Sequence, residues 1–435
     1  MCFKRTVTGR RSRQAGLPDL AIDVPYLGEI RVRSPGTLNI SEACARVTAL
    51  LLATAALAAW LYLIFARGGF WRCNERDDWP SAALADWPSV AVVVPARNEA
   101  EQIGASIASL AGQEYAGPWT VILVDDDSSD GTADIARRLL ANHGEERLRV
   151  VRGRALPEGW TGKLWAIAQG IALARALPRP PDYLLLTDAD IVHPSDSLSG
   201  LVAHAHSNGL VLTSLMVKLR CRSFAERVSI PAFIFFFQML YPFAWVNQPR
   251  RAIAAAAGGC MLVRADALAQ AGGIEVIRGA LIDDCALARV LKLHGPIWLG
   301  LTTRVTSKRH YESLADIRAL VVRSAYAQLS YSPLLLAGTV AALAATYLLP
   351  PVFALLGADL PRLLGAVTWG LMALAFAPTL RFYRRSPLWG LALPVIALMY
   401  LIFTVDSAYQ YARGRGGTWK GRAQASMQSD LSELP

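Results

Sequence analysis

The sequence contains none of the short motifs that mark several large enzyme classes. There is no G-x-G-x-x-G, no G-x-x-x-x-G-K-[ST], no H-E-x-x-H and no G-x-S-x-G. These absences argue against a glycine-rich dinucleotide site, a P-loop nucleotidase, a zinc protease and an α/β-hydrolase. The six cysteines are scattered without a C-x-x-C pair, which predicts neither a zinc site nor a disulfide framework. A reducing, cytosolic environment therefore suits the soluble part of the chain.

Charged residues are missing from several long stretches. Overall, 53% of the residues are hydrophobic and 18% are charged, and the apolar excess gathers at residues 47–66 and after residue 333. This distribution is typical of a protein with membrane spans. The net charge of +10 comes mainly from arginines beside these apolar segments, and no long basic stripe is present. We therefore expect a lipid bilayer, and no nucleic acid, as the partner of the basic residues.

The apolar segments divide the chain into regions. Residues 47–66 lack charged side chains and are followed by Arg67, and at ~1.5 Å per residue they can cross a hydrocarbon core of ~30 Å. For the first 45 residues, the alternative to a basic, disordered arm is a start codon assigned too far upstream. We predict a basic, disordered arm at 1–46, a transmembrane helix at 47–66, a linker at 67–88, a catalytic domain at 89–310, an amphipathic interface region at 311–333, transmembrane segments at 334–409 and a basic tail at 410–435.

The last membrane region contains three candidate spans, at 334–356, 360–380 and 388–409. Three full crossings would separate the arginine-rich loop at 381–385 from the basic tail, which conflicts with the rule that basic loops stay in the cytosol. The alternative is that one of the three segments is re-entrant, and the sequence does not identify which.

Residues 228–246 are the ambiguous apolar stretch. Their hydropathy alone would permit a crossing, but a crossing here would place Asp188 and Asp284 on opposite sides of the bilayer. The stretch is rich in aromatic residues and contains Pro231 and Pro242. We therefore predict an interfacial segment, with a buried core helix as the alternative.

Buried β-branched and leucine runs alternate with helical segments between residues 90 and 187. The pattern predicts strands at 90–95, 121–124, 149–152 and 183–187, and helices at 99–111, 132–142 and 163–177. Such alternation predicts an α/β fold, a mostly parallel sheet with helices on both faces. Ligands of these sheets bind outside the carboxyl ends of the strands.

Asp188 and Asp190 follow the last of these strands directly. Two carboxylates at positions i and i+2 on a bend can reach one cation, and their hard oxygens suit Mg²⁺ or Mn²⁺. Such a cation would neutralise a departing diphosphate. A turn with solvated acids is the plainer alternative.

Two further acidic clusters accompany this pair. Asp125, Asp126 and Asp127 end the second strand, where a carboxylate can accept hydrogen bonds from a ribose or a base, although turn chemistry is the alternative. Asp283 and Asp284 begin a predicted helix, where the dipole alone could explain them. Because adjacent carboxylates in an apolar run repel one another, at least one pKa should be raised, as a general base requires.

Several motifs together resemble the family 2 glycosyltransferases, whose fold is the Rossmann-like GT-A type. They are VVVPARNEAEQI (92–103), VDDDSSDGT (124–132), DAD (188–190) and the later DD (283–284). Further stretches are similar to the hopene-associated glycosyltransferases of bacteria: GWTGKLWA (159–166), AAAAGGCMLVRADAL (254–268), LIDDCALA (281–288), YSP (331–333) and WKGR (419–422).

The resemblance implies a set of site residues. The residues that would bind the nucleotide-sugar are Pro95, Ala96, Glu99, Asp125, Asp126, Lys163 and Asp188. The metal would be held by Asp188 and Asp190, and Asp284, with Asp283 beside it, would be catalytic. The acceptor side would contain Gly258, Gly259, Cys260 and Arg323. The family's threonine–glutamate–aspartate motif here reads Ile282-Asp283-Asp284, so two of its positions differ. The Q/R-x-x-R-W motif of processive members is reduced to LVVRS (320–324), which weakens a polymer-synthase interpretation.

The resulting prediction is a membrane-bound inverting glycosyltransferase. It would move one sugar from a nucleotide-diphosphate sugar to a lipid, for which the resemblance implies a hopanoid, with a divalent cation (Mg or Mn) as cofactor. The resemblance places it in the bacterial inner membrane with the catalytic domain in the cytosol. The alternatives are a polyprenyl-phosphate glycosyltransferase, a processive synthase and a decayed membrane scaffold. A transporter is disfavoured because Asp406 is the main ionisable residue in the spans.

Overall fold

Four strands form the parallel half of one sheet. The computed structural model describes residues 40–79, 84–143, 147–416, 418–419 and 422–423. Strands β1 (Val90–Ala96), β2 (Trp119–Asp125), β3 (Leu148–Arg152) and β4 (Tyr183–Thr187) pair in parallel in the order β3-β2-β1-β4. All residues of β1 and β4 are buried, as expected for strands covered on both faces.

The second half of the sheet contains strands of both directions. It comprises β5 (Ile191–Val192), β6 (Leu212–Lys218), β7 (Cys260–Arg264) and β8 (Ile297–Ser307), and the full order is β3-β2-β1-β4-β7-β6-β8-β5. Strand β7 is antiparallel to both β4 and β6, β5 is antiparallel to β8, and β6 and β8 are parallel. The predicted α/β fold class, a Rossmann-like and mostly parallel sheet, is confirmed.

Alternate side chains of β1 enter two different cores. Val92 and Val94 pack in one core with Ile103 and Ile107 of helix α2, and Val93 packs in the other with helix α4. The close approach of α4 depends on Gly170, because a Cβ at this position would lie 2.4 Å from a Val93 methyl group. The helices around the sheet are α2 (Ile103–Ala111), α3 (Thr132–His143), α4 (Gly162–Arg175), α5 (Ser197–Ser207), α8 (Ala265–Gln270) and α9 (Asp283–Leu291).

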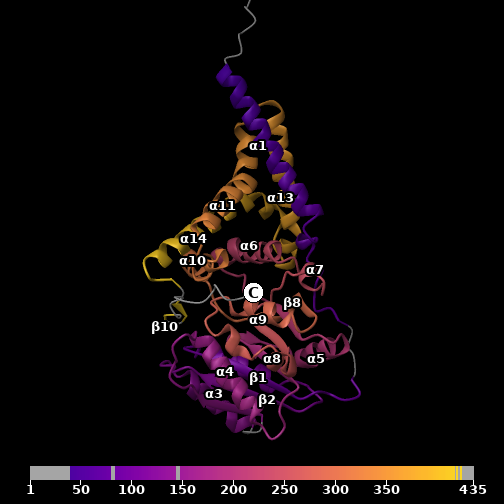
Figure 1. Ribbon diagram of the computed structural model, residues 1–435, viewed down its shortest axis with the longest axis vertical. Helices are drawn as coiled ribbons and strands as arrows, with labels where there is room; N and C mark the ends of the chain where they lie inside the picture. The colour runs from indigo at the N-terminus through magenta and orange to yellow at the C-terminus, as the bar shows by residue number, and fades with distance from the viewer. Residues whose placement is uncertain (1–39, 80–83, 144–146, 417, 420–421, 424–435) are drawn as a thin grey trace, which may run out of the picture. The chain divides into compact units, whose positions relative to one another are not determined.

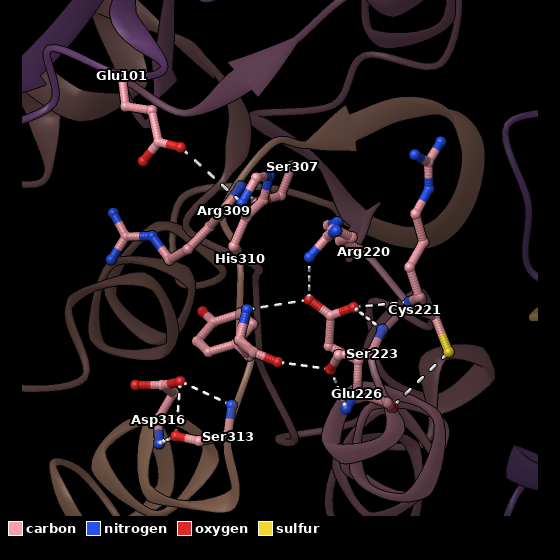
Figure 2. A network of polar contacts seen from close by, with 12 residues as sticks. Glu101, Arg220, Cys221, Ser223, Glu226, Ser307, Arg309, His310, Ser313 and Asp316 are labelled. Carbon is pink, nitrogen blue, oxygen red and sulfur yellow. Dashed lines mark hydrogen bonds and ion pairs between the residues drawn. The ribbon is translucent and has the colours of Figure 1, made fainter.

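Helices α6 (Phe224–Leu240) and α10 (Leu314–Val322) lie between the sheet and the apolar helices (Figure 1). Helix α6 packs against α10, α13 and α14. Its first turn carries a capping box in which Ser223 and Glu226 bond reciprocally (Figure 2). Helix α6 ends at Leu240, and a short helix α7 (Phe243–Val246) follows.

Five helices among the described residues are long and apolar enough to cross a membrane: Ser41–Phe65, Phe224–Val246, Pro333–Leu356, Asp359–Phe382 and Pro387–Ala412. They comprise α1 (Ile40–Phe65), α6 with α7, α11 (Pro333–Leu343) with a π-helical turn (Ala344–Leu348) and α12 (Leu349–Leu356), α13 (Asp359–Phe382), and η5 (Pro387–Ala392) with α14 (Leu393–Ala412). Short elements complete the chain: η1 (Phe70–Arg72), η2 (Ile274–Ile277), η3 (Ala327–Leu329), β9 (Thr418–Trp419) and β10 (Arg422–Ala423).

Contacts place both ends of the last apolar segment beside the sheet domain. Before the segment, the Arg385 guanidinium donates to the Cys221 carbonyl just after β6, at 3.3 Å. At the other end, Ser407 Oγ donates to the Val322 carbonyl of α10 at 2.6 Å and accepts from Tyr326 N at 3.0 Å. Between these two ends, the Leu391 carbonyl of the segment accepts a hydrogen bond from Trp369 Nε1 in the middle of α13.

Two predicted boundaries are wrong. Helix α2 begins at Ile103 and not at residue 99, because the Glu99 carbonyl accepts from the amides of Gln102 and Ile103 in a turn. Helix α1 begins at Ile40, so residues 40–46 are helical where a disordered arm was predicted. The rest of the predicted arm, residues 1–39, lies outside the described residues. Residues 1–47 form one unit and residues 48–435 another, and the sheet lies in the second.

Candidate active site

Lys163 joins two of the three acidic clusters. Its Nζ lies 3.0 Å from Asp188 Oδ1 and 3.1 Å from Asp283 Oδ2. Thr161 caps helix α4 by accepting from Leu164 N, which fixes Lys163 in the first turn. Burial alone would lower the pKa of Lys163, but the Asp188 and Asp283 carboxylates outweigh it, and the pKa is raised. Lys163 therefore remains a cation between the end of β4 and the start of α9.

Asp284 is held by two backbone amides. Its Oδ2 accepts from Gly258 N at 2.9 Å, and its Oδ1 accepts from Cys285 N at 2.7 Å. Burial, and then the charge of Asp283, raise the pKa of Asp284 to about 6, although Lys163 and the two amides act in the opposite direction. A Cβ at Gly258 would lie 3.1 Å from Lys163 Nζ and 3.5 Å from Asp284 Oδ2, so a larger residue would crowd both groups.

Asp190 is bound by a loop that the sequence did not single out. Its Oδ2 accepts from Ser307 Oγ at 2.6 Å and lies 3.6 Å from Arg309 Nε. Arg309 also donates to Glu99 Oε1 at 2.7 Å. Burial would lower the pKa of Arg309, but Asp190 and Glu99 outweigh it and raise the pKa. The available signal was the basic triplet 308–310, which directly follows strand β8.

Figure 2 shows how this loop is anchored. Its Tyr311 N donates to Glu226 Oε1 at 2.9 Å, and Ser223 Oγ donates to the Tyr311 carbonyl at 2.7 Å. The loop thus contacts Asp190 through Arg309 and the first turn of α6 through the Tyr311 backbone.

The Asp188 and Asp190 carboxylates fit a divalent cation of the kind predicted. Both line one pocket, and both supply the hard oxygen ligands that Mg²⁺ and Mn²⁺ prefer. No group of three or more His, Cys, Asp and Glu residues that could hold a metal occurs in the part of the chain that the structure describes. The pair suits a cation that takes its other ligands from a bound phosphate and water.

Two cavities meet at Asp283 and Asp284. One, which we call the polar pocket, measures about 220 Å³. The other, the apolar cavity, measures about 350 Å³ and extends between helices α6, α10, α11 and α14. Of the predicted site residues, the polar pocket is lined by Pro95, Glu99, Lys163, Asp188, Asp190, Gly258, Gly259, Asp283, Asp284 and Arg323. Asp283, Asp284 and Arg323 line both cavities.

The remaining predicted residues do not line either cavity. Ala96 and Asp125 end strands β1 and β2, and Asp126 N donates to the Ala96 carbonyl at 2.8 Å. The Asp126 carboxylate lies 3.8 Å from Arg97. Cys260 is fully buried in β7, where burial raises its thiol pKa to about 12. None of these four predicted residues is among the residues that line the two cavities.

Residues 91–272 match the model of the family described as glycosyl transferase family 2. A curated relative is the undecaprenyl-phosphate 4-deoxy-4-formamido-L-arabinose transferase of Pectobacterium carotovorum subsp. carotovorum (strain PC1). It is 31% identical over 124 residues, which are 28% of this chain and 35% of the relative. The match thus spans about a third of the relative's length.

Two solved structures that match the chain are a mannosyltransferase and a glucosyl-3-phosphoglycerate synthase. The mannosyltransferase PcManGT from Pyrobaculum calidifontis, in complex with GDP-Man and Mn²⁺, matches with a TM-score of 0.47 and 20% identity over 83% of this chain and 99% of that chain. A glucosyl-3-phosphoglycerate synthase from Mycobacterium tuberculosis, with Mn²⁺, UDP and glucosyl-3-phosphoglycerate, matches with a TM-score of 0.36 and 20% identity over 56% of this chain and 79% of that chain.

Proposed function

We propose that this chain, which carries a glycosyl transferase family 2 domain, transfers one sugar from a nucleotide-diphosphate sugar to a membrane lipid with inversion at the anomeric carbon. The observation that carries the proposal is the position of Asp283 and Asp284, which line the polar pocket and the apolar cavity at once. A carboxylate at such a junction can act on an acceptor hydroxyl while the donor occupies the other side.

The polar pocket is the proposed donor site. Asp188 and Asp190 would hold a Mg²⁺ or Mn²⁺ ion, which would neutralise the charge of the diphosphate. Lys163 supplies a permanent positive charge beside Asp188, and Arg309 supplies one beside Asp190. Glu99 and Pro95 line the same pocket, and Asp125, Asp126 and Ala96 at the ends of β2 and β1 are proposed to bind the nucleoside.

Asp284 is the proposed general base. It removes the proton of the acceptor hydroxyl as the oxygen forms a bond to the anomeric carbon, while the bond from that carbon to the diphosphate breaks. The proton passes to the Asp284 carboxylate, and the nucleoside diphosphate departs with the bonding electrons. The two amides of Gly258 and Cys285 fix the carboxylate in one orientation, which supports attack in line.

The proposed acceptor is a membrane lipid, and the sequence resemblance implies a hopanoid. The apolar cavity opens between helices that are apolar enough to enter a bilayer. Helix α6 has 17 residues, or about 25 Å at 1.5 Å per residue, which is short of a ~30 Å hydrocarbon core. This length supports α6 as an interfacial helix. The catalytic domain is proposed to lie on the cytosolic side of a bacterial inner membrane, as the sequence resemblance implies.

A polyprenyl-phosphate acceptor is the second candidate, because the curated relative is named as an undecaprenyl-phosphate transferase. Mass analysis of the product formed from a labelled donor and a membrane lipid extract separates the two. A product that keeps the lipid phosphate would identify the second candidate.

The proposed base is tested by Asp284→Asn in the full-length protein. We expect sugar transfer to fall by roughly 10²–10⁴-fold, because this is the usual contribution of general-base catalysis. Binding of the nucleotide-sugar, measured by calorimetry, should remain nearly unchanged. Asp134→Asn, on the exposed face of α3, is the matched control and should keep full activity. Normal turnover by the Asp284 variant would refute the assignment.

A further inference from the structure

The apolar cavity is lined by aromatic side chains of one helix and by side chains of three other helices. Helix α6 contributes Phe233, Phe236 and Phe237, and Thr339 and Leu343 of α11 face them together with α14. A volume of about 350 Å³ lies within the range of roughly 300–1,000 Å³ that is usual for ligand sites. The cavity ends at Asp283 and Asp284, so a ligand in it presents its head group to these carboxylates.

Several neutral polar groups in this wall already bond within the protein. The Tyr400 hydroxyl donates to the Ser229 carbonyl at 3.0 Å, and Thr404 Oγ donates to the Tyr400 carbonyl at 2.8 Å. The Gln328 amide donates to the Tyr241 hydroxyl at 2.7 Å. These groups are therefore occupied, and the apolar surface of the wall remains for a hydrocarbon.

The charged side chains in the wall carry a net negative charge. They are Asp283, Asp284 and Arg323, one cation against two carboxylates. Lys163 pairs with Asp188 and Asp283 and lines the polar pocket, not the apolar cavity. A lipid phosphate at this position would meet two carboxylates at close range, and like charges repel strongly in a partly buried site. Phosphate sites instead gather several cationic or N–H donors.

We propose that the apolar cavity binds an uncharged lipid alcohol and excludes lipid phosphates, with the alcohol hydroxyl beside Asp284. This inference rests on the proposed function, since it names the acceptor class of that site. It also accounts for the base: a hydroxyl needs a general base to become a nucleophile, whereas an ionised phosphate needs far less help.

The test uses two photoactivatable probes that differ only in the head group. Diazirine-bearing geranylgeraniol and diazirine-bearing geranylgeranyl phosphate are each added at equal mole fraction to nanodiscs that contain the full-length protein. After irradiation, mass spectrometry quantifies the labelled peptides from 233–241 and 320–329. We expect the alcohol to label them at least about tenfold more than the phosphate, because repulsion of a little over 1 kcal/mol gives such a ratio.

Two matched variants show whether the label lies in the cavity. Leu343→Trp fills the cavity from α11 and should abolish labelling of these peptides by the alcohol. Leu334 lies on the same helix, but its side chain is 81% exposed and does not line the cavity. Labelling should therefore persist in Leu334→Trp.

Each outcome decides the inference. Preferential labelling by the alcohol that L343W abolishes and L334W preserves supports it. Equal or stronger labelling by the phosphate overturns it, as does the absence of cavity labelling by either probe. Calorimetric binding of the nucleotide-sugar in the same nanodiscs separates this failure from that of the proposed function, because a protein that binds no donor would fail both.

Discussion

Asp284 connects the electrostatics of the site with a measurable pH dependence. The folded protein raises the pKa of this carboxyl from 3.8 to about 6, first by burial and then by the charge of Asp283. Because a base must be ionised, kcat/KM should be constant above pH 7 and fall about tenfold for each unit below the pKa. Stability has the opposite sign: a carboxyl with a raised pKa favours the fold below about pH 3.8, and this contribution is lost as the pH rises through about 6.

The Asp283 side chain provides the control for this profile. Asp283→Asn removes a negative charge that raises the pKa of Asp284 and keeps the Lys163 cation, which lowers it. The pKa of Asp284 should therefore fall. We expect the acidic limb of the kcat/KM profile to move to lower pH by about one unit. A limb that stays in place would mean that Asp284 does not govern it.

Lys163 should matter more for donor binding than for the base. Lys163→Met leaves Asp188 and Asp283 without their shared cation, and breaking a buried charge pair is strongly unfavourable. We expect the calorimetric Kd of the nucleotide-sugar to rise by at least about tenfold, with a smaller increase for Lys163→Arg because the charge is kept. Donor affinity equal to wild type in the methionine variant would remove Lys163 from the site.

At the scale of elements, local pattern predicted one half of the sheet and not the other. The strands β1 and β4 are continuous buried runs, and their carboxyl ends place Asp188 where the sequence indicated. Strand β7 enters antiparallel between β4 and β6. Its pairing with β4 joins residues more than 70 positions apart, which no local pattern records. Ser307 and Arg309 were missed for the same reason, because β8 carries them to Asp190 across 117 residues of sequence.

Glu226 shows how one element depends on another. Its buried carboxylate accepts from the amides of Arg222, Ser223 and Tyr311 (Figure 2). Glu226→Gln offers one carbonyl oxygen in place of two, so at least one buried donor loses its partner, at a cost of about 1–3 kcal/mol. We expect a lower Tm in detergent and weaker donor binding, since the Tyr311 contact anchors the loop of Arg309.

The control for this element is Glu101→Gln, whose side chain is 74% exposed and contacts only His310 at 3.9 Å among the ion pairs described. Its Tm should match that of the wild type. A Glu226 variant with the same Tm and donor affinity would show that the capping box does not hold the loop.

At the scale of the whole molecule, the hydrogen bonds at the two ends of the last apolar segment bear on its topology. Three full spans after residue 333 would conflict with the rule that basic loops stay in the cytosol. The segment Pro387–Ala412 starts just after Arg385, which bonds to the sheet domain, and ends beyond Ser407, which bonds to α10. Both ends therefore lie on the side of the site. We infer that this segment is re-entrant, which leaves the basic loop at 381–385 and residues 413–416 on one face of the membrane, as the rule requires.

Cysteine accessibility tests this topology in intact cells. Arg384→Cys and Arg415→Cys should both resist a membrane-impermeant maleimide until the membrane is permeabilised, because the proposed topology places both in the cytosol. Ala358→Cys, in the turn between α12 and α13, should react without permeabilisation if those helices form a full hairpin. The background should lack Cys2, the exposed Cys44 and the partly exposed Cys221, so that labelling reports the introduced thiol. Opposite behaviour of the Arg384 and Arg415 variants would mean that Pro387–Ala412 crosses the bilayer, and the charge of the tail would then need another explanation.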